Sequence, residues 1–280
     1  MRVVAMAVTS AALVAALAAC RAPVPSGMPA AAESDDAAAV ELRRQSARFA
    51  ATELSADLTD LPPNEREALA HLVRAAQVMD ALFLEQVWSG NETMLQALAK
   101  DESAAGKARL HAFLLNKGPW SRLDHNEPFV DGAPPKPASA NYYPADATKA
   151  EIEGWIGSLG TDERSRATGF FTTIRRGPTG RLTAVPYSLE YQGALSLAAQ
   201  HLRAAAAATT QPTLKAFLEA RAAAFASDDY YDSDVKWMEL NSSIEPTIGP
   251  YEVYEDEWFN YKAAFEAFIT VKDRDASERL

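Results

Sequence analysis

Residues 244–268 read IEPTIGPYEVYEDEWFNYKAAFEAF, and this stretch decides the fold of the last part of the chain. We expect a short strand near residues 246–253, followed by a helix over residues 257–271. An extended segment can line a groove, where Glu245 and Glu252 offer carboxylates to the ammonium group of a ligand. The free edge of a strand also pairs with extended peptides through main-chain hydrogen bonds. The simpler alternative is an amphipathic strand and helix with a polar outer face.

Upstream, residues 170–174 are β-branched and aromatic, which is typical of a strand. Residues 177–180 are typical of a turn, and residues 182–187 would form the second strand. This pattern predicts a β-hairpin near residues 169–187. Apolar spacing and alanine content predict helices in the rest of the chain, and the Pro-, Gly- and Asn-rich residues 117–141 predict a long loop. The helices are expected at 64–88, 92–115 with a break near Asp101, 148–156, 187–208 and 212–225. The predicted class is α+β and predominantly α-helical.

The N-terminus has the features of an export signal. Arg2 precedes an apolar run that ends in Leu17-Ala18-Ala19-Cys20, a sequence similar to the bacterial lipoprotein cleavage box. We therefore expect a lipoprotein signal peptide at 1–20, lipidation of Cys20, a flexible tether at 21–45 and a folded domain at 46–280. The alternative is a membrane-spanning helix, but the apolar run is shorter than the roughly 20 residues that a span needs.

Lipidation predicts that the mature protein is anchored to a membrane on its periplasmic side. Arg21, rather than Asp, follows the cysteine, which favours the outer membrane. The net charge of −11 over 280 residues, with no basic stripe, excludes nucleic acid as a partner. The single cysteine excludes a disulfide framework and Cys-rich zinc modules. No nucleophile elbow, phosphate-binding glycine loop or dinucleotide fingerprint is present.

The histidines do not form a helical zinc motif. His71, His111, His125 and His201 lack the one-turn spacing that such a motif needs. A metal site assembled from distant histidines remains an alternative to surface or core positions.

Two further clusters have both a structural and a functional interpretation. The acidic run 228–234 lacks the EF-hand glycine, because Asp234 is the sixth residue counted from Asp229. We interpret it as a helix end with acidic caps, with a calcium site as the alternative. Arg175, Arg176 and Arg181 surround the hairpin turn, where a solvated turn is favoured over an anion clamp.

The block at 248–268 resembles the bacterial branch of the dipeptidyl peptidase III family of zinc peptidases. The resemblance extends from about Phe49 to the C-terminus, and shorter matching pieces occur at 86–91, 116–124, 141–144, 229–231 and 237–238. It implies the N-terminal portion of a two-lobed, helix-rich fold whose cleft binds extended peptides. In the family a helix with His-Glu-x-x-Gly-His and a later glutamate hold zinc. Neither motif occurs in this sequence.

The resemblance also implies roles for particular residues. Glu245 matches an acidic position that anchors the substrate's amino group, whereas Thr247 replaces a tyrosine that stabilises the oxyanion. Glu245, Glu252 and Tyr254 are therefore expected to line the substrate cleft. No catalytic residue and no metal ligand are assigned, since zinc is expected only for the complete enzyme.

The predicted function is that of an exported, lipid-anchored peptidase-like protein that ends before the zinc motif and is inactive alone. Its expected partners are a peptide substrate and the missing C-terminal half. The alternative is a non-catalytic periplasmic lipoprotein that binds peptides or a partner. If the other lobe is missing, an apolar face of Trp258, Phe259, Phe265 and Phe268 is expected to be exposed.

Overall fold

The computed structural model describes residues 37–273, 276–277 and 279. The predicted signal peptide, the lipidation site Cys20 and the start of the tether lie outside these residues. Helix α1 (Ala37–Ser46) overlaps the predicted tether, so residues 37–45 are helical rather than flexible coil. Among the residues described, no helix combines the length and the apolar character needed to span a membrane.

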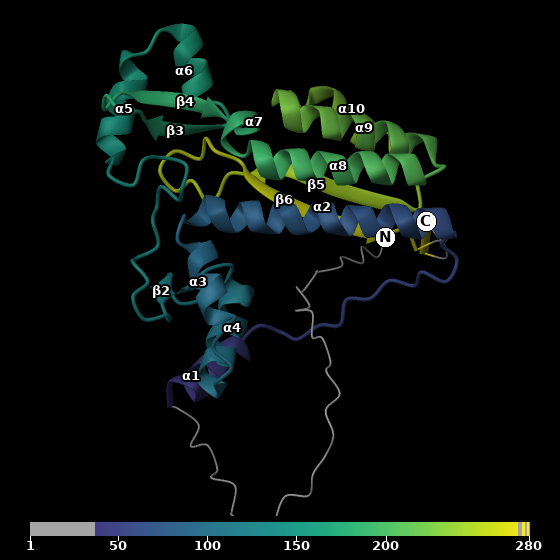
Figure 1. The fold of residues 1–280 in the computed structure, drawn as a ribbon, viewed down its shortest axis with the longest axis horizontal. Helices are drawn as coiled ribbons and strands as arrows, with labels where there is room; N and C mark the ends of the chain where they lie inside the picture. The colour runs from purple at the N-terminus through teal and green to yellow at the C-terminus, as the bar shows by residue number, and fades with distance from the viewer. Residues whose placement is uncertain (1–36, 274–275, 278, 280) are drawn as a thin grey trace, which may run out of the picture.

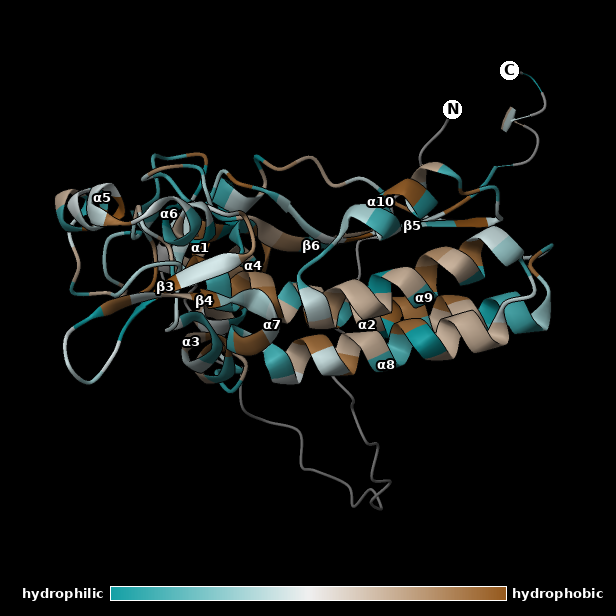
Figure 2. Cartoon of the chain, turned by 90° about the horizontal axis from the view of Figure 1, so that it is seen from above, coloured by the Kyte–Doolittle hydropathy of each residue, from teal (hydrophilic) through white to brown (hydrophobic). Residues whose placement is uncertain are grey.

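Three long helices form one layer of the molecule (Figures 1 and 2). They are α2 (Pro63–Val87), α8 (Gln192–Ala208) and α9 (Pro212–Ser227). Helices α2 and α8 run antiparallel, because the Asn64 side-chain amide at the start of α2 lies 3.4 Å from the Ala208 carbonyl at the end of α8. Leu72 and Leu202 are fully buried in the core between them. The predicted helices in these regions are confirmed.

A two-stranded antiparallel sheet packs against this layer. Strand β5 (Ile244–Glu252) pairs with β6 (Ala264–Val271), in a register from Ile244 opposite Val271 to Glu252 opposite Ala264. The register shifts between Pro250 and Glu252. The sheet contacts α2 and α9, and the predicted short strand near 246–253 is thereby confirmed.

The predicted helix at 257–271 is wrong, because this segment is a loop followed by strand β6. The Asp256 carboxylate accepts hydrogen bonds from the backbone N–H groups of Tyr261 at 2.9 Å and of Phe259 at 3.3 Å, and Asn260 is left-handed with φ 56°. The Gln86 side chain then accepts a hydrogen bond from the Phe265 N–H at 2.8 Å. Hydrogen bonds to the side chains of Asp256 and Gln86 thus replace the backbone hydrogen bonds that a helix would make.

The expected exposed aromatic face is wrong as well. Phe265 is fully buried, Trp258 and Phe259 pack against the main core, and only Phe268 is half exposed, at 50%. The side chains that were predicted to share one helical face lie partly in a loop and partly on the two faces of a strand.

The predicted hairpin is present. Strand β3 (Thr172–Arg176) pairs with β4 (Leu182–Pro186), and the turn between them contains Gly180 at φ +80°. Figure 1 shows this hairpin beside helices α5 and α6. The adjoining helices are α5 (Lys149–Ser158), α6 (Thr161–Ala167) and α7 (Tyr187–Glu190).

The remaining elements are short. Their bounds are α3 (Asn91–Leu98), α4 (Ala104–Asn116), β1 (Trp120–Ser121), β2 (Glu127–Pro128) and α10 (Tyr231–Met238). The gap between α3 and α4 confirms the predicted break near Asp101. Helices α1 and α4 form a small apolar cluster separate from the main core. In and just after the long loop, the side chains of Trp120, Tyr142 and Tyr143 are buried. The fold is α+β and predominantly helical.

Candidate functional site

The outer face of the β5–β6 sheet carries the predicted site residue Glu245. Ile244 and Ile248 are fully buried, whereas Glu245 and Thr247 lie on the opposite face and are partly exposed. Successive side chains of a strand point to opposite faces, so this alternation separates the core face from the outer face. Phe268 lies opposite Thr247 on that outer face.

One edge of β5 has no strand partner among the residues described. The Ser243 carbonyl accepts a hydrogen bond from the Lys272 N–H at 2.9 Å, so odd-numbered positions of β5 carry the bonds to β6. Even-numbered positions therefore direct their backbone groups to the other edge. Pro246 and Pro250 occupy two of these positions and have no N–H to donate. Ile248, between them, is fully buried; its N–H has no strand partner, and its carbonyl accepts a long hydrogen bond from the Tyr251 hydroxyl at 3.4 Å.

Acidic side chains lie at both ends of this surface. Among the residues that the structure describes, Glu245, Glu252 and Glu266 form no ion pair and no side-chain hydrogen bond. Burial raises the pKa of Glu266, and the charge of Glu252 raises it further. Glu245 lies seven positions from Glu252, which corresponds to roughly 20 Å along a strand. The two ends can therefore each attract a cationic group, but not the same one.

Tyr254 lies beyond the end of β5 and is 76% exposed. The neighbouring Glu255 is instead held in an ion-pair network, at 2.6 Å from the Arg122 guanidinium and 3.2 Å from Lys136. Burial acts to raise the pKa of Glu255, but its hydrogen bond and ion pair with Arg122 outweigh burial and lower it. This network holds the loop that follows Tyr254.

A buried arginine on α9 packs against strand β5. The Arg221 side chain of α9 is fully buried and lies 2.5 Å from the Asp234 carboxylate, with the ring of Tyr251 5.6 Å away. A Cβ atom at Gly249 would lie 2.7 Å from Arg221 Nη1, so the close approach requires glycine. The acidic run 228–234 therefore supplies a partner for Arg221.

Asp228 has a separate structural role in the same run. It ends α9 in the left-handed conformation, and its carboxylate accepts hydrogen bonds from the Ser188 N–H and hydroxyl. The expected helix end is confirmed.

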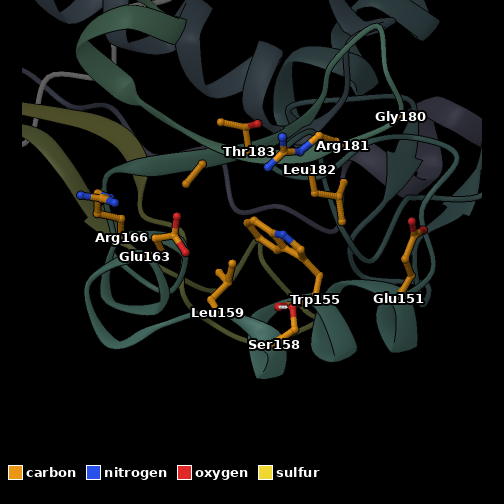
Figure 3. A pocket seen from close by; sticks show the side chains of 11 residues that line it. Glu151, Trp155, Ser158, Leu159, Glu163, Arg166, Gly180, Arg181, Leu182 and Thr183 are labelled. Carbon is orange, nitrogen blue, oxygen red and sulfur yellow. Dashed lines mark hydrogen bonds between the residues drawn. The ribbon is translucent and has the colours of Figure 1, made fainter.

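A concave region lies between α5, α6 and strand β4 (Figure 3). Its volume is about 660 Å³, and Figure 3 shows Trp155 pointing into it between Leu159 and Leu182. Glu163 and Arg181 are at its rim. Acidic and basic side chains are both spread around the opening, so the charged groups do not converge on one point where a ligand could bind. Of the other hairpin arginines, Arg175 pairs with Glu190 and Arg176 with Glu151, so both guanidinium groups are held in ion pairs within the chain.

The residues described contain no group of three or more His, Cys, Asp or Glu side chains that could hold a metal ion. The structure does bring together His71 and His201, whereas His111 and His125 are exposed. Sequence spacing indicated no such pair, because the two residues belong to different helices.

Sequence reasoning also missed Glu266, which it placed on a helix. The alternation of Phe265, Ala267 and Ile269 with Glu266 and Phe268 is the two-residue period of a strand. That period was the available signal.

Comparisons with known proteins find similar chains, among them the three that follow, whereas no family model matches. The structure of dipeptidyl-peptidase III from Corallococcus sp. strain EGB has a TM-score of 0.84 and 60% sequence identity, over 86% of this chain and 45% of that one. The structure of DPP III from Caldithrix abyssi has a TM-score of 0.80 and 44% identity, over 85% of this chain and 45% of that one.

The third is Nudix hydrolase 3 of Arabidopsis thaliana, which is 35% identical over 295 residues. This match covers 88% of the present chain and 38% of the plant protein. The chain thus spans less than half the length of each of these relatives. Because the match covers only 38% of the plant protein, its name transfers no activity to this chain.

Proposed function

Because the chain has the fold and much of the sequence of dipeptidyl-peptidase III over a part of that fold, we propose that it supplies the peptide-binding strand of such a peptidase. The two matched structures cover 86% and 85% of the chain at 60% and 44% identity, which supports a peptidase-type function. The finer roles below rest on the geometry of β5.

The unpaired edge of β5 is the observation that carries the proposal. At the centre of this edge the Ile248 N–H has no strand partner, and the Ile248 carbonyl accepts a hydrogen bond from the Tyr251 hydroxyl at 3.4 Å that a peptide would displace. The flanking Pro246 and Pro250 limit pairing to a short segment. An extended peptide adds to such an edge by main-chain hydrogen bonds, and the side chains on the outer face then distinguish among peptides. The half-exposed Phe268 offers apolar contact on that face.

Glu245 is the proposed anchor for the free amino group of the peptide. Its side chain has no other charged partner among the described residues, so its carboxylate is available to an ammonium group. Glu252 and Tyr254 would contact the peptide farther along, near Glu266. A free N-terminus and an extended backbone are thus recognised by different parts of the same strand.

Zinc belongs to the proposed complete enzyme. The described residues do not supply the ligand set of that catalytic ion, because they contain no group of three or more possible ligands. We therefore derive no hydrolytic step from this chain and propose that it binds peptides without cleaving them. The zinc-binding part would come from sequence outside residues 1–280, as the 45% coverage of the relatives allows. The signal-like residues 1–20 support export, lipidation of Cys20 and a periplasmic, outer-membrane location.

Titration calorimetry with a tetrapeptide tests the anchor. The peptide with a free N-terminus should bind at least 10-fold more tightly than its N-acetylated form, since a charge-assisted hydrogen bond is lost on acetylation. Glu245→Gln should abolish this difference, whereas the control Glu252→Gln should retain it. Equal binding of the two peptides to the unmodified chain would refute the role of Glu245.

A hydrolysis assay tests the absence of catalysis. The purified chain, supplied with zinc, should not release the chromophore from a dipeptidyl-naphthylamide. Turnover that a chelator abolishes would show that this chain holds its own catalytic metal. Peptide binding that zinc leaves unchanged, together with no turnover when the rest of the dipeptidyl-peptidase III fold is added, would favour a non-catalytic binding lipoprotein.

A further inference from the structure

His71 and His201 form a close pair on two packed helices. His71 lies on α2 and His201 on α8, and their Nδ1 atoms are 3.4 Å apart, with ring centroids separated by 5.7 Å. Both side chains are partly exposed. Among the described residues, neither ring has another hydrogen-bonding partner. The two nitrogens therefore face each other at a site that solvent ions can reach.

The separation of the two nitrogens suits a bridging ion better than a shared proton. Hydrogen bonds from N–H groups are usually about 2.7–3.2 Å long, so a bond at 3.4 Å is weak. Zn²⁺ binds histidine nitrogen at about 2.0–2.1 Å, and tetrahedral ligands at that distance lie roughly 3.3–3.4 Å apart. The observed spacing thus matches two ligands of a tetrahedral ion without movement of either helix.

We propose that His71 and His201 bind one divalent transition-metal ion of the class that prefers imidazole, such as Zn²⁺, through their Nδ1 atoms. Water would complete the coordination, so the ion would exchange with solvent. The site would join α2, which packs against the β5–β6 sheet, to α8. It is separate from the zinc of the complete enzyme and does not depend on the proposed peptide binding.

The surroundings of the pair are mixed in charge. The positive charge of Arg74, three residues after His71 on α2, acts on the His201 ring. Arg74 repels a cation, but Glu67, one helical turn before His71, places a negative charge on the same side of α2. The buried neighbours Leu72 and Leu202 hold the two helix backbones in place.

Zinc binding to the full chain, purified without a polyhistidine tag, provides the test. Calorimetry should detect one Zn²⁺ per chain, and Co²⁺ should give the intense visible absorption of a tetrahedral site. His71→Gln and His201→Gln should each weaken zinc binding at least 10-fold. The exposed His111 supplies the matched control, because His111→Gln should leave the affinity unchanged.

Thermal unfolding gives a second readout that is independent of peptide binding. Saturating zinc should raise the Tm of the unmodified chain by about 5 °C and should not raise that of the double variant. The variants should retain the far-ultraviolet circular dichroism of the parent chain without metal. Zinc binding of equal strength to the His71→Gln/His201→Gln double variant, or no binding to the unmodified chain, would overturn the proposal.

Discussion

Lys262 is a fully buried lysine, and its removal should change how the stability of the chain depends on pH. Its Nζ donates to the Ala167 carbonyl at 2.6 Å, the Gly169 carbonyl at 3.0 Å and the Thr172 hydroxyl at 2.8 Å. Burial lowers its pKa from 10.5 to about 7, although the charge of Asp256 acts in the opposite direction. The folded chain therefore releases this proton more readily than the unfolded chain.

The sign of the effect follows from proton linkage. Below pH 7 Lys262 is charged in both states, and the full cost of burying the charge is present. Between pH 7 and 10.5 the unfolded chain binds more protons than the folded one, so the free energy of unfolding rises with pH. At about 1.4 kcal/mol per pH unit, the total gain attributable to Lys262 is about 5 kcal/mol.

Urea unfolding followed by tryptophan fluorescence, at intervals between pH 6 and 10, measures this contribution. The free energy of unfolding of the unmodified chain should rise, relative to that of Lys262→Met, by about 1 kcal/mol or more for each pH unit above 7. Lys272→Met removes an exposed lysine and serves as the control, because it should keep the pH dependence of the parent chain. Parallel pH profiles for the unmodified chain and Lys262→Met would refute the reasoning.

Three further substitutions, each paired with a control, test the packing of the β5–β6 sheet and the cap of α5 by urea denaturation. Gly249→Ala should cost about 2 kcal/mol, because its Cβ would lie 2.7 Å from a buried guanidinium nitrogen. Gly193→Ala, which has open space around its Cβ and no positive φ, should not destabilise the chain. Phe265→Ala should cost about 3–5 kcal/mol, and the half-exposed Phe268→Ala much less; equal losses would contradict the assigned sheet faces. Thr148→Ala should cost about 1 kcal/mol by removing the N-cap of α5, and Thr148→Ser should restore it.

Local patterns in the sequence predicted most of the helices and the hairpin. The apolar spacing of α2 and the β-branched run around Ile174 are signals that lie within one element. Strand β6 was not predicted, because Ala263 and Ala264 favour a helix when only neighbours are considered. Its conformation depends on the Gln86 side chain and on the Tyr187 hydroxyl, which donates to the Ala263 carbonyl at 2.9 Å. Such partners cannot be assigned before the fold is known.

Only the part of the candidate site that lies within one element could be predicted from the sequence. Glu245 and Glu252 lie on a segment with a recognisable extended pattern, so their place on β5 could be anticipated. Glu266 joins them only through the pairing of β5 with β6. The pairing of His71 with His201 likewise requires the antiparallel packing of two helices, because 130 positions separate the residues in the chain.

Hydrogen exchange at the backbone amide of Ile248 tests the peptide-binding strand most directly. This N–H should exchange more slowly by at least 10-fold when a saturating tetrapeptide with a free N-terminus is added, because it then donates to the peptide. The amide of Phe265, which already donates to the Gln86 side chain, should keep its rate. Unchanged exchange at Ile248 in the presence of bound peptide would contradict pairing along β5.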